Sequence, residues 1–497
     1  MFNSNNFTLL KGAFNMVTVL IVFSFVFFFL NVISILIMIF LERKDPRSIQ
    51  SWILIFLMLP PGFSMYIYIV FGRGPKLNKK KVENRNFRLF NELSKILNIK
   101  DYSKIPNENE LDTSILKFNL LKNKSAITEN NHVKVLNTAQ EKFEELIKDI
   151  KNAKCNIHFL YYIIRNDNIG NLIINLLTEK AKEGVKVRVI YDDTGCLCIP
   201  KKMFDKLKEA GGEVYRFFPS YVKFININLN YRNHRKVVVI DGKIGYVGGI
   251  NIGDEYMSLS KKLTPWKDCH LKIIGDAVNF LQLEFIKDLS YVSNHKIETE
   301  DDFQNKYFPK SEIQNKTYTQ IVSSGPGEKE YEKIKSTYLK MIYSAKKEIF
   351  IQTPYLALDD GFLSAILYAA QYGIKIKIML PYIYDKRVVY RVTCSYIQQL
   401  MDAGIEIYLY KGFLHSKVMI MDDCVTSIGT ANFNIRSFSL NYEINAFITD
   451  KNICSRMKEI FFEDMKNSIK LDESYENNKS ILLKFEEGIC RLFTPLL

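Results

Sequence analysis

Two stretches of this sequence decide its fold: His234-Arg-Lys236-Val-Val-Val-Ile-Asp241 and His415-Ser-Lys417-Val-Met-Ile-Met-Asp422. Six residues after each aspartate comes a short polar segment, Gly248-Gly249-Ile250-Asn251 in the first copy and Gly429-Thr430-Ala431-Asn432 in the second. Both copies read H-x-K-x4-D-x6-G-[G/T]-x-N. The chain has only 6 histidines, so two matches with the same offsets argue against coincidence and predict one shared chemistry.

The spacing within each motif predicts its local geometry. Residues i and i+2 of a β-strand point to the same side, so the histidine and the lysine are expected to project together from strands 234–240 and 415–421. A turn at each aspartate then reverses the chain. A second strand, near 244–247 or 424–428, returns the glycines and the asparagine to the histidine. Glycine lets a phosphate approach the backbone, and the asparagine amide can donate to its oxygens.

These side chains predict phosphodiester transfer. Two imidazoles and two ammonium groups suit a phosphodiester whose charge must be held through a pentavalent transition state. One histidine attacks phosphorus and forms a covalent phospho-enzyme, and the other protonates the departing alcohol and later deprotonates the incoming hydroxyl. The predicted catalytic residues are His234, Lys236, Asp241, His415, Lys417 and Asp422. The predicted phosphate-binding residues are Gly248, Gly249, Asn251, Gly429, Thr430 and Asn432.

Each histidine also needs a carboxylate on its far nitrogen to hold the right tautomer. The candidates are Asp268 for the first half and Glu443 for the second, with Glu255 as a weaker one. No H-E-x-x-H motif occurs, and the ammonium groups already supply the positive charge that a metal would bring. We therefore expect neither a metal site nor a cofactor.

The composition narrows the class of partner. Hydrophobic residues make up 47% of the 497 residues and charged residues 25%, which is typical of a chain that buries a real core. The formal net charge is +14. An excess of cations of this size indicates a polyanionic partner, either nucleic acid or the anionic face of a membrane.

The N-terminal segment favours the membrane. Residues 17–41 form an apolar stretch without a charged residue, and 52–71 form a second one, interrupted by Pro60-Pro61-Gly62. Both are long enough to cross a bilayer, so the sequence predicts two transmembrane helices. The loop between them carries three basic residues and the outer flanks carry six. The positive-inside bias then predicts a multi-pass protein of the cell membrane with both termini and the catalytic domain in the cytoplasm, and no nucleic-acid partner.

The rest of the chain is predicted to be an α/β fold made of two similar mixed-sheet halves related by a pseudo-twofold. Each half reads strand, helix, glycine, strand before its histidine motif, with Gly184 in the first half and Gly373 in the second. The predicted organisation is a membrane anchor at 1–81 and a linker at 82–131. The first half follows at 132–305, the second half at 306–473 and a C-terminal tail at 474–497.

Beyond these patterns, the sequence resembles the phospholipase D superfamily and, within it, the bacterial cardiolipin synthases. The resemblance covers nearly the whole chain. It rests on the paired apolar segments and the two histidine motifs. It also rests on Tyr162-Ile-Ile-Arg165-Asn-Asp167, Gly248-Gly-Ile-Asn251-Ile-Gly-Asp-Glu255-Tyr256, Asn432-Phe-Asn434-Ile-Arg436-Ser437-Phe438 and Asn441-Tyr-Glu443.

This resemblance implies a reaction. Two phosphatidylglycerol molecules would give cardiolipin and glycerol through a phosphohistidine, with the anionic membrane lipid as the partner. Analogy with the superfamily favours His234 as the nucleophile, although the residues alone leave the choice between the two histidines open. The family usually has aspartate where this chain has Asn434, which puts a contact next to the motif in question.

Several alternatives share these motifs. A phospholipase D-type hydrolase would use water as the acceptor, another phosphatidyltransferase would use a different alcohol, and a nuclease would fit the net charge. A lipid-binding scaffold would have degenerate motifs. The aromatic and basic loop 217–232 can contact headgroups or be buried. The tail 481–497 can lie on the membrane or dock as a C-terminal helix. The sequence leaves the oligomeric state open.

Overall fold

The computed structural model describes residues 4–41, 46–72, 103–106, 113–219, 230–260, 262–293, 303–326 and 332–496. The chain forms two compact units. The helical unit comprises Met1–Lys76 with Tyr221–Asn230, and the α/β unit comprises nearly all of the remaining residues. The predicted linker segments 82–102 and 107–112 and the loop segment 220–229 lie outside the described residues.

One long helix dominates the helical unit. Helix α1 (Ser4–Leu41) contains a 26-residue apolar span, Met16–Leu41, that is almost entirely exposed. At 1.5 Å per residue this span is about 39 Å long, whereas the hydrocarbon core of a bilayer is about 30 Å thick. Helix α1 is therefore long and apolar enough to anchor the chain in a membrane.

The second predicted span, 52–71, is not one helix. It is divided between α2 (Pro46–Met58) and α3 (Pro61–Phe71), with Pro60 as the N-cap of α3. The rings of Trp52 and Tyr68 are 5.1 Å apart although 16 residues separate them in the sequence, so the chain folds back between the two helices. Two consecutive prolines cannot continue the hydrogen bonds of α2 and instead start a new helix. The sequence predicted a kink here, and the structure has a reversal.

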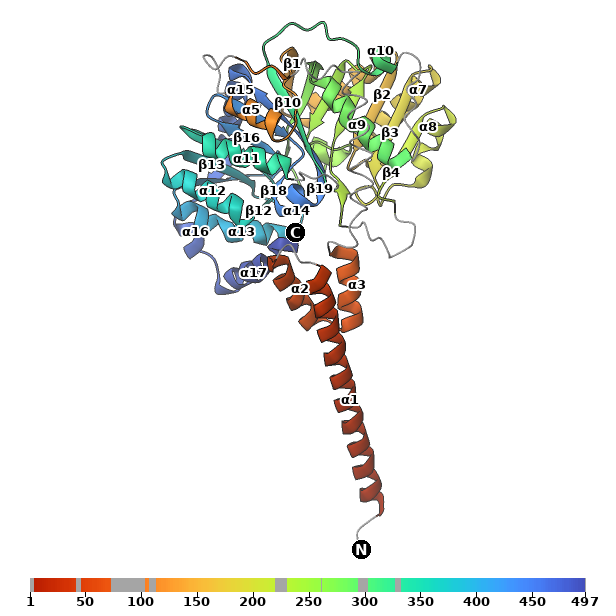
Figure 1. Cartoon of the computed structure of the whole chain (residues 1–497), viewed down its shortest axis with the longest axis vertical. Coiled ribbons are helices and arrows are strands. Elements are labelled where there is room, and N and C mark those ends of the chain that lie inside the picture. The colour runs from red at the N-terminus through yellow and green to blue at the C-terminus, as the bar shows by residue number, and fades with distance from the viewer. Residues whose placement is uncertain are drawn as a thin grey trace. The chain divides into compact units, whose positions relative to one another are not determined.

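The helical hairpin α2–α3 packs on the C-terminal part of α1 (Figure 1). The side chains of Asn31, Ser34 and Met38, which lie on one face of α1, are buried there. The core of the hairpin is formed by Met38 with Trp52, Phe56 and Tyr68. The N-terminal part of the apolar span has no such cover and keeps its large side chains exposed.

The first half of the α/β unit contains a seven-stranded mixed sheet of order β1-β9-β7-β6-β2-β3-β4. Its strands are β1 (Asn131–Leu136), β2 (Asn156–Tyr161), β3 (Lys186–Asp192), β4 (Glu213–Phe217), β6 (Val237–Ile240), β7 (Ile244–Gly248) and β9 (His270–Gly275). The helices of this half are α6 (Ala139–Asn152), α7 (Asn168–Lys182), α8 (Asp205–Glu209), α9 (Val278–Ser293) and α10 (Phe303–Tyr307), with the short η2 (Lys201–Phe204) and η3 (Asp254–Met257).

The second half repeats this sheet in the order β10-β19-β17-β16-β11-β13-β14, with β20 added at the far edge. Its strands are β10 (Tyr318–Ser324), β11 (Glu348–Gln352), β13 (Lys375–Pro381), β14 (Glu406–Tyr410), β16 (Val418–Met421), β17 (Val425–Gly429), β19 (Asn441–Thr449) and β20 (Ser468–Lys470). Its helices are α11 (Lys333–Ser344), α12 (Asp360–Gln371), α13 (Arg387–Asp402), α14 (Ile435–Ser439), α15 (Lys451–Lys466), α16 (Ser474–Asn477) and α17 (Ile481–Leu492), with η4 (Thr494–Leu496).

The two sheets correspond strand for strand. In each sheet, the strand that follows the motif lysine, β6 or β16, pairs antiparallel with its neighbours. Two βαβ crossovers then add parallel strands on one side. The strands are buried on both faces, as their runs of Val, Ile and Leu require. The fold is therefore a mixed α/β fold with two mixed sheets.

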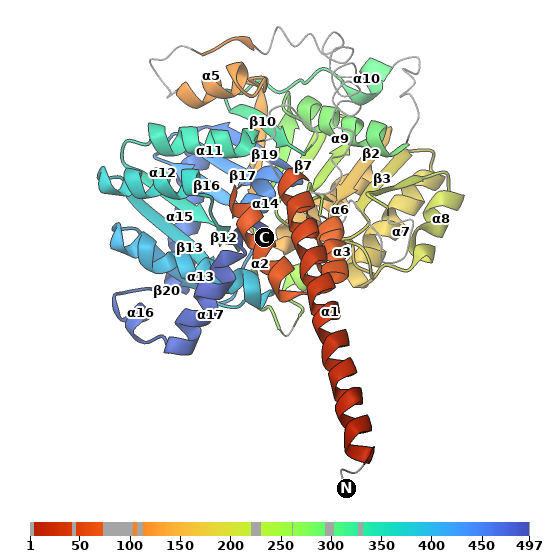
Figure 2. The ribbon, with the colours of Figure 1, turned by 60° about the horizontal axis from the view of Figure 1, so that its bottom comes forward.

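Three hydrophobic layers hold the α/β unit together. Helices α9 and α15 lie with the inner faces of both sheets in a central core, in which Val237 and Val239 of β6 join Ile420 of β16. Helices α6 and α7 cover the outer face of the first sheet, and α11, α12 and α13 cover that of the second. Figure 2 shows the two halves side by side with β7 and β19 near their junction.

The end of the predicted linker belongs to the folded core. Helix α5 (Ser114–Leu121) buries both Ile115 and Leu116, and Ile115 joins the hydrophobic layer that includes α11. The side chain of Asn123 donates to Asn119 and to the Thr337 hydroxyl of α11. The contacts with α11 join residues more than 200 positions apart in the sequence, which is why a polar, asparagine-rich segment looked like a spacer.

Candidate active site

His234 lies in a short link before β6, not inside the strand predicted for it. The preceding strand β5 (Arg232–Asn233) pairs with β19 of the other half, and the His234 backbone N–H donates to the carbonyl of Tyr442. This pairing places the imidazole beside the next residue of β19. His234 Nδ1 lies 2.9 Å from Glu443 Oε2, so the carboxylate accepts from Nδ1 and leaves Nε2 free for substrate.

His415 has the same arrangement with the halves exchanged. The preceding strand β15 (Phe413–Leu414) pairs with β8 (Trp266–Lys267) of the first half, and the His415 N–H donates to the carbonyl of Lys267. His415 Nδ1 then lies 2.6 Å from Asp268 Oδ2. Each histidine is therefore oriented by a carboxylate of the opposite half.

This crossing corrects the prediction that assigned Asp268 to the first histidine and Glu443 to the second. Both carboxylates were the right residues, but each contacts the other half's imidazole. The physical reason is that the two-residue strands β5 and β8 do not extend their own sheet and instead pair across the junction with β19 and β15. Glu255, the weaker candidate, forms an ion pair with Arg165 at 3.0 Å and its described contacts do not include a histidine.

Both motif lysines are buried next to their histidines. Lys236 Nζ donates to the backbone carbonyl of His234 at 2.6 Å, and Lys417 Nζ donates to that of His415. The two side chains are at most 1% exposed. The ammonium groups are thus held at fixed positions under the imidazoles.

The electrostatics of the four side chains show that they share one site. Burial lowers the pKa of Lys236 to about 7, and the neighbouring Lys417 ammonium contributes to this lowering, whereas Glu443 opposes it. Burial also lowers the pKa of Lys417 to about 8, against the influence of Asp268 and Glu443. Two buried cations, one of which lowers the pKa of the other, favour the arrival of an anion such as a phosphodiester.

Both histidines are neutral in the free protein near pH 7. Burial lowers the pKa of His234 to about 4, with Glu443 opposing the shift. Burial and then Lys417 lower the pKa of His415 to about 4. Burial alone would raise the pKa of Glu443, but the His234 imidazole and a hydrogen bond from Thr430 bring it below its ordinary value. Each imidazole keeps about a tenth of its side chain accessible.

The structure does not bring Asp241 and Asp422 to this site. Each lies at the turn beyond β6 or β16, in the left-handed region with φ of 52°. The Asp241 carboxylate accepts from the backbone N–H groups of Lys154, Cys155 and Asn156. Asp422 accepts in the same way from residues 346–348. The aspartates of the two motifs therefore tie the start of β2 and β11 to the histidine-bearing segment.

The predicted phosphate-binding glycines lie where a side chain would collide with its neighbours. A Cβ on Gly249 would lie 2.0 Å from Asp268 Oδ1, and one on Gly429 would lie 2.3 Å from Asn445 Oδ1. These glycines leave room for the side chains that build the site. Thr430 takes the place of Gly249 in the second motif, and its hydroxyl bonds with the backbone of Ile444 next to Glu443.

The two motif asparagines are buried beside the histidine segments. Asn251 Oδ1 accepts from the backbone N–H of Ile163, and Asn432 N–H donates to the Ser437 hydroxyl. Among the described residues, Asn432 Oδ1 has no hydrogen-bond partner. Asn434 is the N-cap of α14, where its Oδ1 accepts from the N–H of Ser437 at 2.8 Å. A neutral asparagine caps a helix about as well as an aspartate, so this departure from the family pattern costs little.

Several contacts of the site escaped the sequence analysis. The ring of Tyr162 lies 4.8 Å from that of His234, and the ring of Trp266 lies 5.1 Å from that of His415. Asp192, at the end of β3, accepts from the N–H of Asn233 next to His234. The only available signal was the position of Asp192 at the carboxyl end of a buried parallel strand, where ligand sites of α/β sheets lie.

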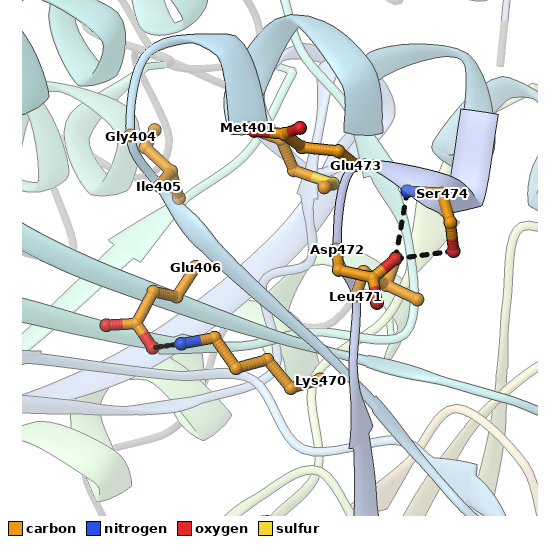
Figure 3. Close-up of a pocket in the computed structure, with 9 residues that line it drawn as sticks. All are labelled: Met401, Gly404, Ile405, Glu406, Lys470, Leu471, Asp472, Glu473 and Ser474. Atoms are coloured by element: carbon orange, nitrogen blue, oxygen red, sulfur yellow. Dashed lines mark hydrogen bonds and ion pairs between the residues drawn. The ribbon is translucent and has the colours of Figure 1, made fainter. Parts of the chain in front are cut away.

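A separate surface pocket of about 510 Å³ lies between the end of α13, β14 and β20 (Figure 3). Three of its charged side chains already have partners, since Lys470 bonds with Glu406 at 2.7 Å and Asp472 accepts from the Ser474 N–H and hydroxyl. Neither histidine motif contributes to it. The pocket therefore belongs to the outer edge of the second sheet and not to the site.

The comparisons with known proteins agree with this geometry. The family model described as "Cardiolipin synthase, PLD-like domain" matches residues 146–264 and 338–465. The chain is 42% identical over 482 residues to a cardiolipin synthase of Staphylococcus aureus (strain Mu50 / ATCC 700699), covering 95% of both chains. It is 40% identical to a cardiolipin synthase of Listeria monocytogenes serotype 4a (strain HCC23), covering 94% of this chain and 97% of that one.

A solved structure shares the fold. The crystal structure of phosphatidylserine synthase from Haemophilus influenzae Rd KW20 aligns with a TM-score of 0.55. The alignment covers 73% of this chain and 95% of that one at 16% sequence identity. At this identity the likeness concerns the arrangement of helices and strands alone.

Proposed function

Because this chain belongs to the cardiolipin synthases of the phospholipase D superfamily, which are phosphatidyltransferases, we propose that it joins two phosphatidylglycerol molecules into cardiolipin and glycerol through a phosphohistidine. The observation that carries the proposal is the crossed pair of dyads. One imidazole is held by Glu443 and the other by Asp268, and both lysines lie underneath. Two equivalent imidazoles at one anionic site suit a displacement in two steps.

In the first step, Nε2 of His234 attacks the phosphorus of one phosphatidylglycerol. A nitrogen–phosphorus bond forms and the bond from phosphorus to the glycerol oxygen breaks. His415, protonated in the substrate complex, gives its proton to that oxygen, and glycerol leaves. In the second step, the hydroxyl of another phosphatidylglycerol attacks the same phosphorus. Neutral His415 removes the hydroxyl proton, and His234 departs as the restored imidazole.

The lysines supply the charge for both steps. Bound phosphate adds a negative charge next to Lys236 and Lys417, which raises their lowered pKa values and keeps both protonated in the complex. The same charge raises the pKa of His415 from about 4, so that the histidine can act as an acid. The substrate therefore completes the protonation state in which the reaction proceeds.

Product analysis tests this proposal. The full-length protein in vesicles of phosphatidylglycerol is expected to make cardiolipin and free glycerol in equal amounts. Phosphatidic acid without cardiolipin would show that the protein is a hydrolase and not a synthase. A phosphatidyl ester of another alcohol, formed when that alcohol is added, would show that the enzyme accepts alcohols other than phosphatidylglycerol. Single substitutions H234A and H415A are expected to lower the rate by about 10⁴-fold or more.

Trapping of the intermediate distinguishes the two histidines. With His234 as the nucleophile, H415A is expected to form a slowly resolving phosphatidyl-enzyme on residue 234, detectable by mass spectrometry of peptides at neutral or alkaline pH. The control H234A is expected to form none. Labelling of His415 in place of His234 would reverse the two roles and leave the reaction itself unchanged.

We also propose that the protein lies in the cell membrane with its α/β unit on the cytoplasmic side. Two crossings would require a second span, but α2 and α3, at about 20 and 17 Å, are each too short to cross about 30 Å. A hairpin that enters and leaves on one face puts the basic residues around the start of α2 and after α3 on the same side. Those residues are Arg43, Lys44, Arg47, Arg73, Lys76, Lys79, Lys80 and Lys81.

This single crossing by α1 places the N-terminus outside the cell, in contrast to the prediction from two spans. The positive-inside bias supports this arrangement. The eight basic residues named above would lie on the cytoplasmic side, whereas Lys11, before the apolar span of α1, would lie on the other side. An N-terminal epitope tag on intact cells distinguishes the two arrangements. Accessibility from outside supports one crossing, and protection until the membrane is permeabilised supports two.

A further inference from the structure

The C-terminal helix α17 is inverted relative to an ordinary surface helix. Both of its glutamates point toward the rest of the α/β unit: Glu486 accepts from the Arg387 guanidinium at 2.8 and 3.0 Å, and Glu487, only 5% exposed, pairs with Lys479 at 2.8 Å. Arg491 donates to the backbone carbonyl of Ser395. Polar contacts thus fix α17 along α13.

The apolar side chains of α17 point away from the protein. Ile481 is 86% exposed, Leu482 80%, Phe485 67% and Ile489 41%. Their spacing of three to four residues puts them on one face of the helix. A helix of a soluble protein turns such a face inward, and a contiguous exposed face of this kind marks an interaction site.

The same surface continues onto the segment that leads into α13 and onto the first turn of that helix. Tyr382, Tyr384 and Val388 are 54%, 39% and 49% exposed, and Arg387, which holds Glu486 of α17, lies between the last two. We define the apolar rim as these three residues together with Ile481, Leu482, Phe485 and Ile489.

The apolar rim borders the active site. Asp385, inside the rim segment, accepts from the hydroxyl of Tyr355 at 2.6 Å, and its charge partly opposes the lowering of the pKa of the motif lysine Lys417 by burial. Tyr355 in turn lies within electrostatic range of Tyr162, whose ring contacts His234. The segment 382–388 therefore has two sets of side chains. Its apolar rim side chains are exposed, and its carboxylate, Asp385, acts on the motif lysine Lys417.

We propose that the apolar rim inserts into the boundary between headgroups and acyl chains of the membrane, next to the entrance of the active site. Helix α1 keeps the chain at a bilayer, and the proposed substrate, on which this inference rests, has its acyl chains in that bilayer. A surface helix of this kind sinks about 5 to 10 Å into the interface. The phosphodiester then reaches the histidines while its acyl chains stay in lipid.

A pair of matched variants tests this docking. Ile481 and Phe485 lie four residues apart on α17, and Tyr368 and Tyr372 lie four residues apart at the end of α12 with similar exposures of 61% and 78%. The α12 pair precedes β13, whereas the rim residues Tyr382 and Tyr384 follow β13, so the control pair lies at the opposite end of that strand from this part of the rim. The variants are I481E/F485E and, as the control, Y368E/Y372E.

The activity of full-length protein in phosphatidylcholine proteoliposomes is measured with two substrates. One is long-chain phosphatidylglycerol within the bilayer, and the other is dihexanoyl phosphatidylglycerol, dissolved as a monomer. I481E/F485E is expected to lose about tenfold or more of its rate with the bilayer substrate, since two apolar side chains that insert into lipid become charged. It is expected to stay within about twofold with the monomeric substrate, and the control within about twofold with both.

A direct readout uses F485W and Y372W in vesicles with brominated acyl chains, after subtraction of the signal from the two native tryptophans. Quenching of the introduced indole is expected in F485W but not in Y372W. Absence of quenching together with normal bilayer activity of I481E/F485E would overturn the docking. A change of oligomeric mass in I481E/F485E without quenching of F485W would overturn it as well and assign the rim to a second copy. Failure of the unsubstituted protein with both substrates would instead contradict the proposed function.

Discussion

The two halves of the α/β unit build their dyads in the same way but with different side chains. His234 is oriented by a glutamate and His415 by an aspartate, each from the other half. The shorter aspartate fits because Gly249 leaves space beside it, whereas Thr430, at the corresponding position of the second motif, supports the glutamate by a hydrogen bond. The comparison teaches that the symmetry of the strands does not extend to the support of each imidazole. It also suggests that the two histidines can be tuned separately.

The crossed carboxylates give the largest expected effect. E443Q and D268N are each expected to lower kcat by about 10² to 10⁴, because each removes the charge that orients and stabilises one imidazole. The pKa values identify the partner. Glu443 raises the pKa of His234 and Asp268 raises that of His415, so each substitution should lower the pKa of the histidine in the opposite half.

Residue-resolved modification by diethyl pyrocarbonate, read by mass spectrometry between pH 4 and 7, measures this effect. D268N is expected to change the pH profile of His415 and leave that of His234 unchanged, and E443Q is expected to do the reverse. A change in the histidine of the same half would contradict the crossing.

The two motif lysines also differ in pKa, and this difference predicts how kcat/KM depends on pH. Lys236 with a pKa of about 7 loses its proton before Lys417 with a pKa of about 8 as pH rises. In the free enzyme this loss removes the attraction for phosphate, so kcat/KM should fall above about pH 7. K236R keeps its charge, because a guanidinium does not deprotonate in this range, and should move the alkaline limb up by about one unit.

The matched variant K417R is expected to leave the limb near pH 7, since Lys236 still titrates first. The profile of kcat should fall at higher pH than that of kcat/KM in the unsubstituted enzyme, because bound phosphate raises both pKa values. Equal shifts in both variants would show that the two lysines titrate as one coupled pair.

The smallest effect on activity is expected at the motif aspartates. D422A removes an acceptor from three partly buried N–H groups and should lower the free energy of unfolding by about 1 to 3 kcal/mol. D241A should cost less, because two of its three donors are exposed. Denaturant unfolding measures both. At temperatures where each variant is folded, kcat should stay within about threefold, and a loss of several hundredfold would return the aspartates to the active site.

Much of the site could be predicted because its residues recur in a short pattern. His234 and Lys236 are two residues apart, and the apolar runs of β6 and β16 show which strand follows the lysine of each motif. The carboxylates Asp268 and Glu443 could be predicted by type, but their partners could not. Each pairing depends on a two-residue strand, β5 or β15, that joins a strand of the other half, and the histidine and its carboxylate are 209 or 147 positions apart in the sequence. Strands of two residues have no periodicity that a sequence could display.

The remaining differences have local causes. The reversal at Pro60 could not be predicted, because a single bent helix and two helices that fold back on each other have the same apolar composition. Asp241 and Asp422 looked catalytic because they complete the motif, whereas their carboxylates serve backbone N–H groups that a sequence does not display. The inward charges of α17 likewise depend on Arg387, almost 100 residues earlier.

The crossed dyads also have a consequence for the evolution of the two halves. A single half carries a histidine and a carboxylate that cannot serve each other, so an ancestral half would have been active only as a pair of identical copies. After duplication and fusion of such a half, a substitution in one copy no longer appears in the other, so each half can change its own side chains. The glutamate on one side and the aspartate on the other, with threonine and glycine behind them, are differences that an identical pair could never acquire.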